Sequence, residues 1–239
     1  MSSPSLSNII FLDIETVPFT NDFNGLSDRL KSAWAKKASY LRTDVFEGDD
    51  ILYKTKAGIF AEFGRIVCIS IGVIVEKDGQ NTLRIKSIYG HDEKDLLIKF
   101  CELLNVGFKN KDIYFCAHNG KEFDFPYICR RLLINRLQIP NLLNIAGKKP
   151  WEVKHLDTLD LWKFGDYKHY TSLDLLATIF NIPTSKDDID GSQVASVYYN
   201  DNDLERIKIY CEKDVSVLTQ VYLSMTSNDL IEEDQIIFV

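Results

Sequence analysis

A run of apolar residues that ends in acidic ones limits the fold more than any other feature of this sequence. Residues 9–15 read IIFLDIE, so Asp13 and Glu15 directly follow a series of large apolar side chains. A continuous apolar run is typical of a strand buried on both faces, in the centre of a sheet covered by helices. Residues two apart in a strand point to the same face, so both carboxylates are predicted to leave one face at the strand's carboxyl end.

Further strand and helix patterns follow this segment. The apolar stretches at 65–76 and 82–89 predict two strands, and the turn residues EKDGQN between them predict an antiparallel hairpin. A helical pattern follows at 92–106, and a short strand at 113–117 leads into a helix that begins near Pro126. Three strands followed by alternating strands and helices predict an α/β fold with a mixed sheet and helices on both faces. The remaining predictions are a strand at 155–162, short helices at 172–180 and 193–199, and a long helix at 203–224.

The length and composition favour one domain. A chain of 239 residues with 45% hydrophobic content can bury a substantial core, so we expect residues 1–239 to form a single domain. Residues 19–60 are the least periodic, with a helical pattern only around 28–40 and an acidic stretch at 44–50. We expect them to form a long insertion beside the functional site, because long irregular segments in compact domains are often lids or binding loops. Residues 226–239 are expected to form a short C-terminal tail.

Targeting signals and cysteine pairs are not evident in the sequence. No apolar run approaches the ~20 residues that span a bilayer, and the N-terminal MSSPSLSN lacks the basic and apolar regions of a signal peptide. We therefore expect a soluble, cytoplasmic protein with no membrane partner. The cysteines are widely spaced without a CxxC pair, and we expect them to be reduced core or helix residues. They are Cys68, Cys101, Cys116, Cys129 and Cys211.

The net charge of -7 argues at first against a nucleic-acid-binding protein. Between residues 121 and 170, however, nine Lys or Arg outnumber six Asp or Glu. A binding site for divalent cations is also rich in acidic residues, so it makes the net charge of the protein more negative when the ions are not included. Eight of these nine basic residues are a candidate track for a phosphate backbone, with scattered solubilising charge as the alternative. They are Lys121, Arg130, Arg131, Arg136, Lys148, Lys149, Lys163 and Lys168.

Three separated segments place acids at the ends of predicted elements. Asp13 and Glu15 end the first strand. Asp124 falls at the start of a helix directly after a strand, where it has a second candidate role as the helix N-cap. Tyr210 and Asp214 are four residues apart, on one face of the last helix. Carboxylates suit Mg²⁺ or Mn²⁺, and two such ions can activate water and stabilise the leaving oxygen of a phosphodiester.

These segments together resemble a known family. Asp13 and Glu15, then N-x-x-x-F-D at 119–124 and Y-x-x-x-D at 210–214, are similar to the motifs of the DEDD exonuclease superfamily, and the tyrosine resembles the DEDDy subgroup. The sequence most resembles predicted 3′-5′ exonucleases related to the proofreading domain of family B DNA polymerases. GRIVCISIG after AEFG, and the later IDGSQV, add to this similarity, which runs over roughly residues 8–225. It implies a DnaQ-like, ribonuclease H-like fold with a five-stranded mixed sheet in the order 3-2-1-4-5, its first three strands antiparallel.

The resemblance also implies roles for the matching residues. Asp13 would bridge two Mg²⁺ or Mn²⁺ ions, with Glu15 and Asp214 completing the site of the ion that activates water. Asp124 would act directly or through water on the second ion. Tyr210 would orient the attacking water, because a phenol with a pKa near ~10 is a poor base at neutral pH. Substrate contacts are implied, mainly by analogy, at Thr16, Asn119 and Phe123.

The implied activity is metal-dependent 3′-5′ exonuclease action on a nucleic acid with a free 3′ end, above all single-stranded DNA. One alternative is a 3′-5′ exoribonuclease of RNA processing, because no residue was identified that discriminates against a 2′-hydroxyl. The other is a catalytically silent ribonuclease H-like binding module, against which the presence of all four acids argues. The chain is too short to hold a polymerase, so a role in proofreading or DNA repair would require a separate partner. His118 and His155 are expected to be ordinary polar residues at strand ends.

Overall fold

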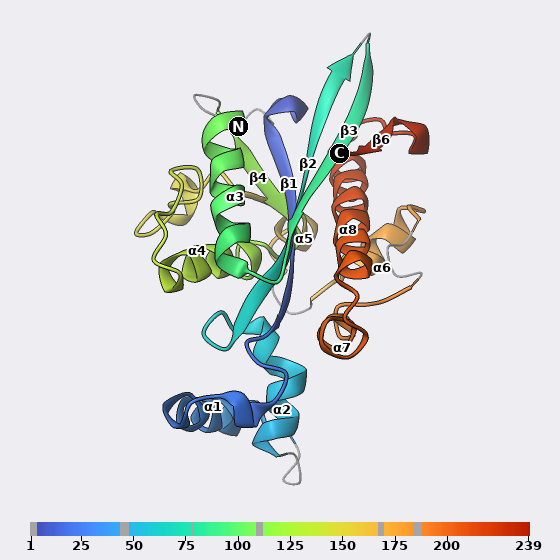
Figure 1. Ribbon diagram of the computed structural model, residues 1–239. Helices are drawn as coiled ribbons and strands as arrows, with labels where there is room; N and C mark the ends of the chain where they lie inside the picture. The colour runs from blue at the N-terminus through green and yellow to red at the C-terminus, as the bar shows by residue number, and fades with distance from the viewer. Residues whose placement is uncertain (1–3, 44–47, 78, 109–111, 167–169, 184–187) are drawn as a thin grey trace.

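A mixed sheet forms the centre of the molecule. The computed structural model describes residues 4–43, 48–77, 79–108, 112–166, 170–183 and 188–239. In these ranges the sheet has six strands in the order β5-β4-β1-β2-β3-β6 (Figure 1). β1, β2 and β3 pair antiparallel, and the other strands pair parallel with their neighbours. The predicted order 3-2-1-4-5 is confirmed, and the predicted strand number is corrected from five to six. The strands are β1 (Ile9–Pro18), β2 (Gly64–Lys77), β3 (Gln80–Tyr89), β4 (Tyr114–Ala117), β5 (Leu156–Asp157) and β6 (Ile236–Phe238).

Helices cover both faces of this sheet, as the sequence predicted (Figure 1). Ile10 and Leu12 of β1 pack in a core cluster with residues of α3 and α4. Ile9 and Phe11 point to the opposite face and pack in a second cluster with residues of α8. The continuous apolar run of β1 therefore reflects burial on both faces. The helices are α1 (Asp28–Leu41), α2 (Asp49–Lys56), α3 (Glu93–Gly107), α4 (Asp124–Ile134), α5 (Thr158–Lys163), α6 (Leu173–Ile179), α7 (Val194–Ser196) and α8 (Leu204–Met225).

The register of β1 against β2 changes where the acids lie. Glu15 is opposite Cys68, but Thr16 is opposite Ile66, so Val67 of β2 is an additional residue at this point. β-Bulges of this kind increase the local twist and are frequent next to active sites. Asp13 and Glu15 alternate with Leu12 and Ile14, so both carboxylates leave the strand on its α8 face, as the two-residue spacing predicted.

The predicted strand at 155–162 is wrong for most of its length. The strand is limited to Leu156–Asp157, and α5 begins at Thr158. The cause is local: the Asp157 carboxylate accepts a hydrogen bond from the Leu159 amide and caps the helix. The apolar pattern of LDTLDLW fits a short helix as well as a strand, and the cap decides between them.

Two helices lie between β1 and β2 and form a lobe at one end of the molecule (Figure 1). The predicted helix at 28–40 is α1, whereas α2 was not predicted, because its acidic start was read as part of an acidic stretch. Of that stretch, residues 44–47 lie outside the described part. The lobe has its own apolar cluster, which includes Trp34, Leu52, Tyr53 and Phe63. A short 3-10 helix, η3 (Ala57–Ile59), leads from this lobe back to the sheet.

The C-terminal residues end in a strand that the sequence analysis did not predict. β6 pairs with β3 over Leu83 to Ile85, and the Val239 amide donates to the Ile85 carbonyl. The Thr82 hydroxyl also donates to the Gln235 side chain at 3.1 Å. Among the described residues, every helix is too short or too polar to cross a membrane.

Candidate active site

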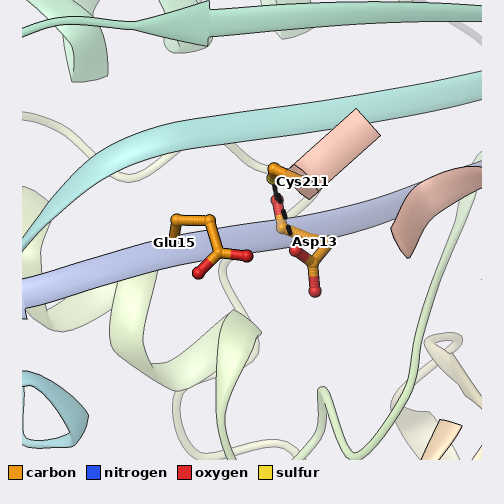
Figure 2. A group of neighbouring side chains, drawn as sticks. All are labelled: Asp13, Glu15 and Cys211. Carbon is orange, nitrogen blue, oxygen red and sulfur yellow. Dashed lines mark hydrogen bonds between the residues drawn. The ribbon is translucent and has the colours of Figure 1, made fainter. Parts of the chain in front are cut away.

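Two acids and a thiol form the tightest group of potential metal-binding side chains in the described part of the chain. Ligand atoms of Asp13, Glu15 and Cys211 all lie within 4.8 Å of one another. Figure 2 shows the two carboxylates side by side on β1 and Cys211 reaching them from α8. The sequence predicted the approach of β1 and α8 through Asp13, Glu15 and Asp214. It did not predict that the sulfur of Cys211 would be part of this group.

The carboxylates of this group repel one another in a buried place. Burial raises the pKa of Asp13 well above its usual range, and the negative charges of Asp214 and Asp124 raise it further. Burial likewise raises the pKa of Glu15, with added contributions from the charges of Asp13 and Asp214. Acids from three elements distant in sequence therefore act on one another at a single place. A bound cation is the usual means of stabilising such a concentration of negative charge.

Asp124 lies at the first position of α4 and is only 3% exposed. Burial raises the pKa of its carboxyl to about 7, while backbone amide groups of Asp124 itself and of Ile14 lower it. The contact with Ile14 places Asp124 next to β1. The predicted second role as an N-cap is wrong, because Phe123 occupies the cap position and makes no side-chain capping bond. The Asp124 carboxylate therefore lies between the start of its own helix and β1.

Tyr210 and Asp214 lie one turn apart on α8, as their spacing predicted. A side-chain hydrogen bond joins the Tyr210 phenol to Asp214. Burial raises the pKa of Tyr210 above its usual range, and the charges of Asp214 and Glu15 act in the same direction. Tyr210 is therefore a protonated hydrogen-bond donor at neutral pH, in agreement with the expectation that it is a poor base.

The structure brings the four predicted acids together to different degrees. Asp13 and Glu15 belong to the group within 4.8 Å, while Asp124 and Asp214 are not members of it. Both of these outer acids nevertheless raise the pKa of Asp13 through their charge. The arrangement is thus a pair of central carboxylates with one further acid from α4 and one from α8.

Cys211 contacts Asp13 directly. Its thiol lies 3.3 Å from Asp13 Oδ2 and 3.5 Å from the Asp13 carbonyl oxygen, with the sulfur as donor (Figure 2). Burial raises the pKa of this thiol well above its usual range, and neighbouring Cys68 adds to the effect. A neutral thiol is a poor metal ligand but a possible donor, so Cys211 orients the carboxylate. The five cysteines of the chain are free and Cys211 is buried, so the prediction of reduced core or helix cysteines is confirmed. The contact of Cys211 with Asp13 was not predicted.

Asp157 is a buried acid that the sequence analysis read only as part of a strand. Its carboxylate accepts hydrogen bonds from the backbone amides of Asn119, Lys121 and Leu159, at 2.8 to 3.0 Å. Asn119 has a left-handed backbone conformation, with φ of 62°. Asp157 thereby holds the turn that leads from β4 to Asp124. The signal in the sequence was an acid directly before the stretch TLDLW, because Asp is a preferred residue at the N-cap of a helix.

A cavity of about 260 Å³ adjoins Glu15. Two of the three predicted substrate residues, Thr16 and Phe123, line it, whereas Asn119 does not. The other lining comes from η3, the end of α2 and the segment before α7, including Lys54 and Ser192. The cavity therefore opens beside the central carboxylates and is walled partly by the lobe between β1 and β2.

The candidate basic track is not supported at every position. Arg131 is buried and bonded to Glu93, so it cannot contact a ligand from solvent. Lys121 pairs with Asp160 at 3.1 Å, and Lys163 lies 3.7 Å from the same residue. Lys168 lies outside the described residues.

The two histidines occupy strand ends, as expected, but their surroundings differ. Nδ1 of His118 hydrogen bonds with the Thr158 hydroxyl at 2.9 Å and Nε2 with the Thr171 carbonyl at 2.8 Å. His155 is 5% exposed and packs against Phe115 and Phe125. Neither histidine belongs to the group around Asp13. The description of His155 as an ordinary polar residue is therefore wrong, because the residue is part of an aromatic core.

Comparison with known proteins identifies the family. A family model described as predicted 3′-5′ exonuclease related to the exonuclease domain of PolB matches residues 59–235. The chain belongs to this family. The match contains Asp124, Tyr210 and Asp214, while Asp13 and Glu15 precede its first residue. The resemblance stated from the motifs is thus confirmed for this PolB-related exonuclease family.

Two other comparisons add less. Comparison with curated proteins gives no match. The family B DNA polymerase from the hyperthermophilic archaeon Pyrobaculum calidifontis is similar in structure, with a TM-score of 0.49 and 13% sequence identity. The similarity covers 90% of this chain and 24% of the polymerase chain, so this chain spans well under two thirds of that protein's length. The fold assignment rests on the sheet order itself.

Proposed function

We propose that this member of the PolB-related exonuclease family is a metal-dependent 3′-5′ exonuclease of the DEDDy type that acts on single-stranded DNA. The carrying observation is the convergence of acids from β1, α4 and α8, expressed in the raised pKa of Asp13 beside Asp214 and Asp124. The family match supports exonuclease activity over residues that include two of these acids. Phosphodiester hydrolysis is the reaction for which such a set of carboxylates is suited.

The donor set fits hard divalent cations. Asp13, Glu15, Asp124 and Asp214 offer only carboxylate oxygens, which Mg²⁺ and Mn²⁺ prefer. The thiol of Cys211 would be a soft ligand, but it is held neutral and donates its hydrogen to Asp13. We propose that Asp13, Glu15, Asp124 and Asp214 would hold such ions, with Asp13 and Glu15 as the central pair. The buried negative charge would then be compensated.

Each protein group has a defined task in this proposal. Bound divalent cations would lower the pKa of water and stabilise the leaving oxygen. Tyr210, kept protonated by burial and bonded to Asp214, would hold the attacking water in line with the scissile phosphate. Thr16 and Phe123, in the cavity beside Glu15, would hold the terminal nucleotide. Asn119 would contribute through its position in the turn before Asp124.

The test is digestion of end-labelled single-stranded DNA and RNA of one sequence, with Mg²⁺, with Mn²⁺ or with EDTA. We expect stepwise loss of nucleotides from the 3′ end of DNA, and no loss in EDTA. Asp13→Ala should lower the rate by about 10³-fold or more, because it removes one of the two central carboxylates. The variant should remain folded, since it also relieves repulsion among buried acids. Asp229→Ala, which changes an exposed acid beyond α8, is the matched control and should leave the rate unchanged.

A second measurement separates binding of the ion from turnover. Mn²⁺ should raise the melting temperature of the parent and of Asp229→Ala, but much less that of Asp13→Ala. If Asp13→Ala degraded DNA as fast as the parent, the role given to Asp13 would be wrong. Degradation of RNA alone would instead identify an exoribonuclease. Binding of DNA without any cleavage would identify a silent binding module.

A further inference from the structure

The cavity beside Glu15 has a wall that the family model match hardly includes. Its lining comes from β1, from α2 and η3, and from the segment before α7. The family match begins at residue 59, so Lys54, Thr55 and Gly58 of this wall precede it. Glu15 is part of the lining. A molecule that fills the cavity therefore contacts the lobe between β1 and β2 and one of the central carboxylates at once.

This wall is fixed to the elements that carry the acids. The Tyr127 hydroxyl, on the helix that begins with Asp124, donates to the Gly58 carbonyl at 2.7 Å. A Cβ added to Gly64 would lie 2.3 Å from that hydroxyl and 2.7 Å from the Gly58 carbonyl oxygen, so the two segments are in close contact. Within α2, the Tyr53 hydroxyl accepts a hydrogen bond from the Thr20 amide at 3.1 Å. The cavity is thus preformed and is not a gap beside a loose loop.

The lining has the chemistry of a nucleotide site. Phe123 and Ile59 provide apolar surface for a base, and Thr16 and Ser192 provide hydroxyl groups for a sugar. Lys54 is the one cationic side chain among the residues that line the cavity in the described part of the chain. It is exposed, on α2, and enters the wall from the side of the lobe. A lysine ammonium group is a frequent phosphate-binding group in proteins.

We propose that the lobe is a substrate-binding element and that Lys54 binds a backbone phosphate of the 3′-terminal nucleotides held in this cavity. The inference rests on the proposed exonuclease function and names how its substrate is held. The volume of about 260 Å³ is of the order of one nucleotide, so the cavity would hold the terminal residue of the strand. Lys56 provides a matched control, because it is exposed on the same helix but two residues away, does not face the same side and does not line the cavity.

The experiment compares Lys54→Gln with Lys56→Gln, each in the parent and in an Asp13→Ala background. Fluorescence anisotropy of a 5′-labelled single-stranded oligonucleotide measures binding in the inactive background. We expect Lys54→Gln to weaken binding about tenfold and Lys56→Gln less than about twofold. Loss of one phosphate contact should also reduce the slope of log K against log salt concentration by about 0.7. In the parent, Lys54→Gln should raise KM by a similar factor with kcat within about twofold.

The outcomes separate this inference from the proposed function. Equal effects of the two lysine substitutions, or an unchanged salt slope for Lys54→Gln, would overturn the role of Lys54. If the parent cleaved DNA but Lys54→Gln bound it as tightly as the parent, the lobe would have no role in substrate binding and the exonuclease function would still be supported. If binding depended on Lys54 but the parent cleaved neither DNA nor RNA, the lobe would bind the nucleic acid and the proposed exonuclease function would be wrong.

Discussion

At the scale of single residues, His155 is the buried polar group with the least support from its surroundings. Within the described part of the chain, neither of its ring nitrogens has a hydrogen-bond partner. The ring packs against Phe125 with centroids 4.5 Å apart and against Phe115 at 5.5 Å. Burial lowers the pKa of His155 from its ordinary value of 6.5 to about 4, and the charges of Lys121 and Lys148 act in the same direction. The fold therefore contains a neutral imidazole in an apolar place.

Replacing His155 by leucine should change the pH dependence of stability. The folded pKa lies below the unfolded one, so the parent keeps its full stability above pH 6.5 and loses it as the pH falls toward about 4. When the pH falls from 8 to 5, this group lowers the unfolding free energy of the parent by about 2 kcal/mol, which is about 1.4 kcal/mol for each pH unit below 6.5. His155→Leu lacks this loss and also removes two unpaired polar atoms, so it should be at least as stable at pH 8. Urea unfolding of both proteins from pH 5 to pH 8 measures the difference.

The comparison between the two proteins isolates this residue. Other titrating groups, including His118, are common to both and cancel in the difference. A gap in unfolding free energy that stayed constant from pH 5 to pH 8 would contradict the assigned protonation state of His155.

Single residues also show how far the sequence determined the candidate site. The two-residue spacing of Asp13 and Glu15 sufficed to place both carboxylates on one face, because alternation in a strand is strict. The position of Cys211 beside Asp13 could not be derived, since it depends on the angle at which α8 crosses β1. The roles of the acids in binding ions stay predictions. Thr16 and Phe123 share a cavity that only the fold assembles.

At the scale of elements, a buried ion pair joins the start of α3, the last turn of α4 and the start of β2. Arg131 of α4 and Glu93 at the start of α3 are 4% and 8% exposed in their side chains. Glu93 Oε1 accepts from the Ile66 amide of β2 at 2.8 Å, and Arg131 donates to the Ala61 carbonyl at 2.8 Å. The pair thus ties α3, α4 and the start of β2 together. Since α4 begins with Asp124, this pair also contributes to the position of that acid.

Breaking this pair from one side should be costly. Glu93→Gln leaves the Arg131 guanidinium buried without a counter-charge, so we expect it to lose about 3–5 kcal/mol of unfolding free energy. The double variant Glu93→Leu with Arg131→Met removes both charges and should lose less than Glu93→Gln alone. Urea unfolding of Glu93→Gln, Arg131→Met and the double variant measures this. If the loss in the double variant were as large as that of Glu93→Gln, the cost would come from packing and not from an unpaired charge.

The elements differ in how well the sequence predicted them. Long amphipathic segments such as α3 and α8 were predicted to within a few residues, because many apolar positions repeat at one period. β5 has two residues and β6 has three, which is too few for any period to be visible. Both are set by their neighbours: Asp157 ends β5 by capping α5, and β3 offers β6 an edge. Tertiary contacts, and not local preference, define these short strands.

At the scale of the whole molecule, the functional features gather on one part of the sheet. β1 carries two acids in the centre of the sheet, and α4 and α8 each bring a further acid to it. The lobe between β1 and β2 extends from this region, as Figure 1 shows, and contributes to the cavity beside Glu15. That residues 19–60 are an insertion, and that the whole chain is one domain, stay predictions. β6 lies on the other side of β2 and β3 from β1, at the far edge of the sheet.

Removal of residues 236–239 should therefore separate stability from activity. The deletion removes the three paired positions of β6 and the bond from the Val239 amide to the Ile85 carbonyl, and it uncovers apolar surface that Ile236 covers. We expect a loss of about 1–2 kcal/mol in unfolding free energy, because a few edge hydrogen bonds and one partly buried side chain are involved. Gln220 still bonds to both backbone groups of Ile231, so the segment after α8 should remain attached.

The rate of nucleotide release should stay within about twofold of that of the full chain, since no acid of the candidate site contacts β6 in the described structure. Urea unfolding and digestion of labelled single-stranded DNA, on one preparation of each protein, measure the two effects. The uncovered edge of β3 is a template for pairing with another chain, so size-exclusion chromatography should accompany both measurements. Loss of cleavage in a truncated protein that remains folded and monomeric would show that the far edge of the sheet influences the acids on β1. The position of β6, separated from β1 by β2 and β3, predicts the opposite.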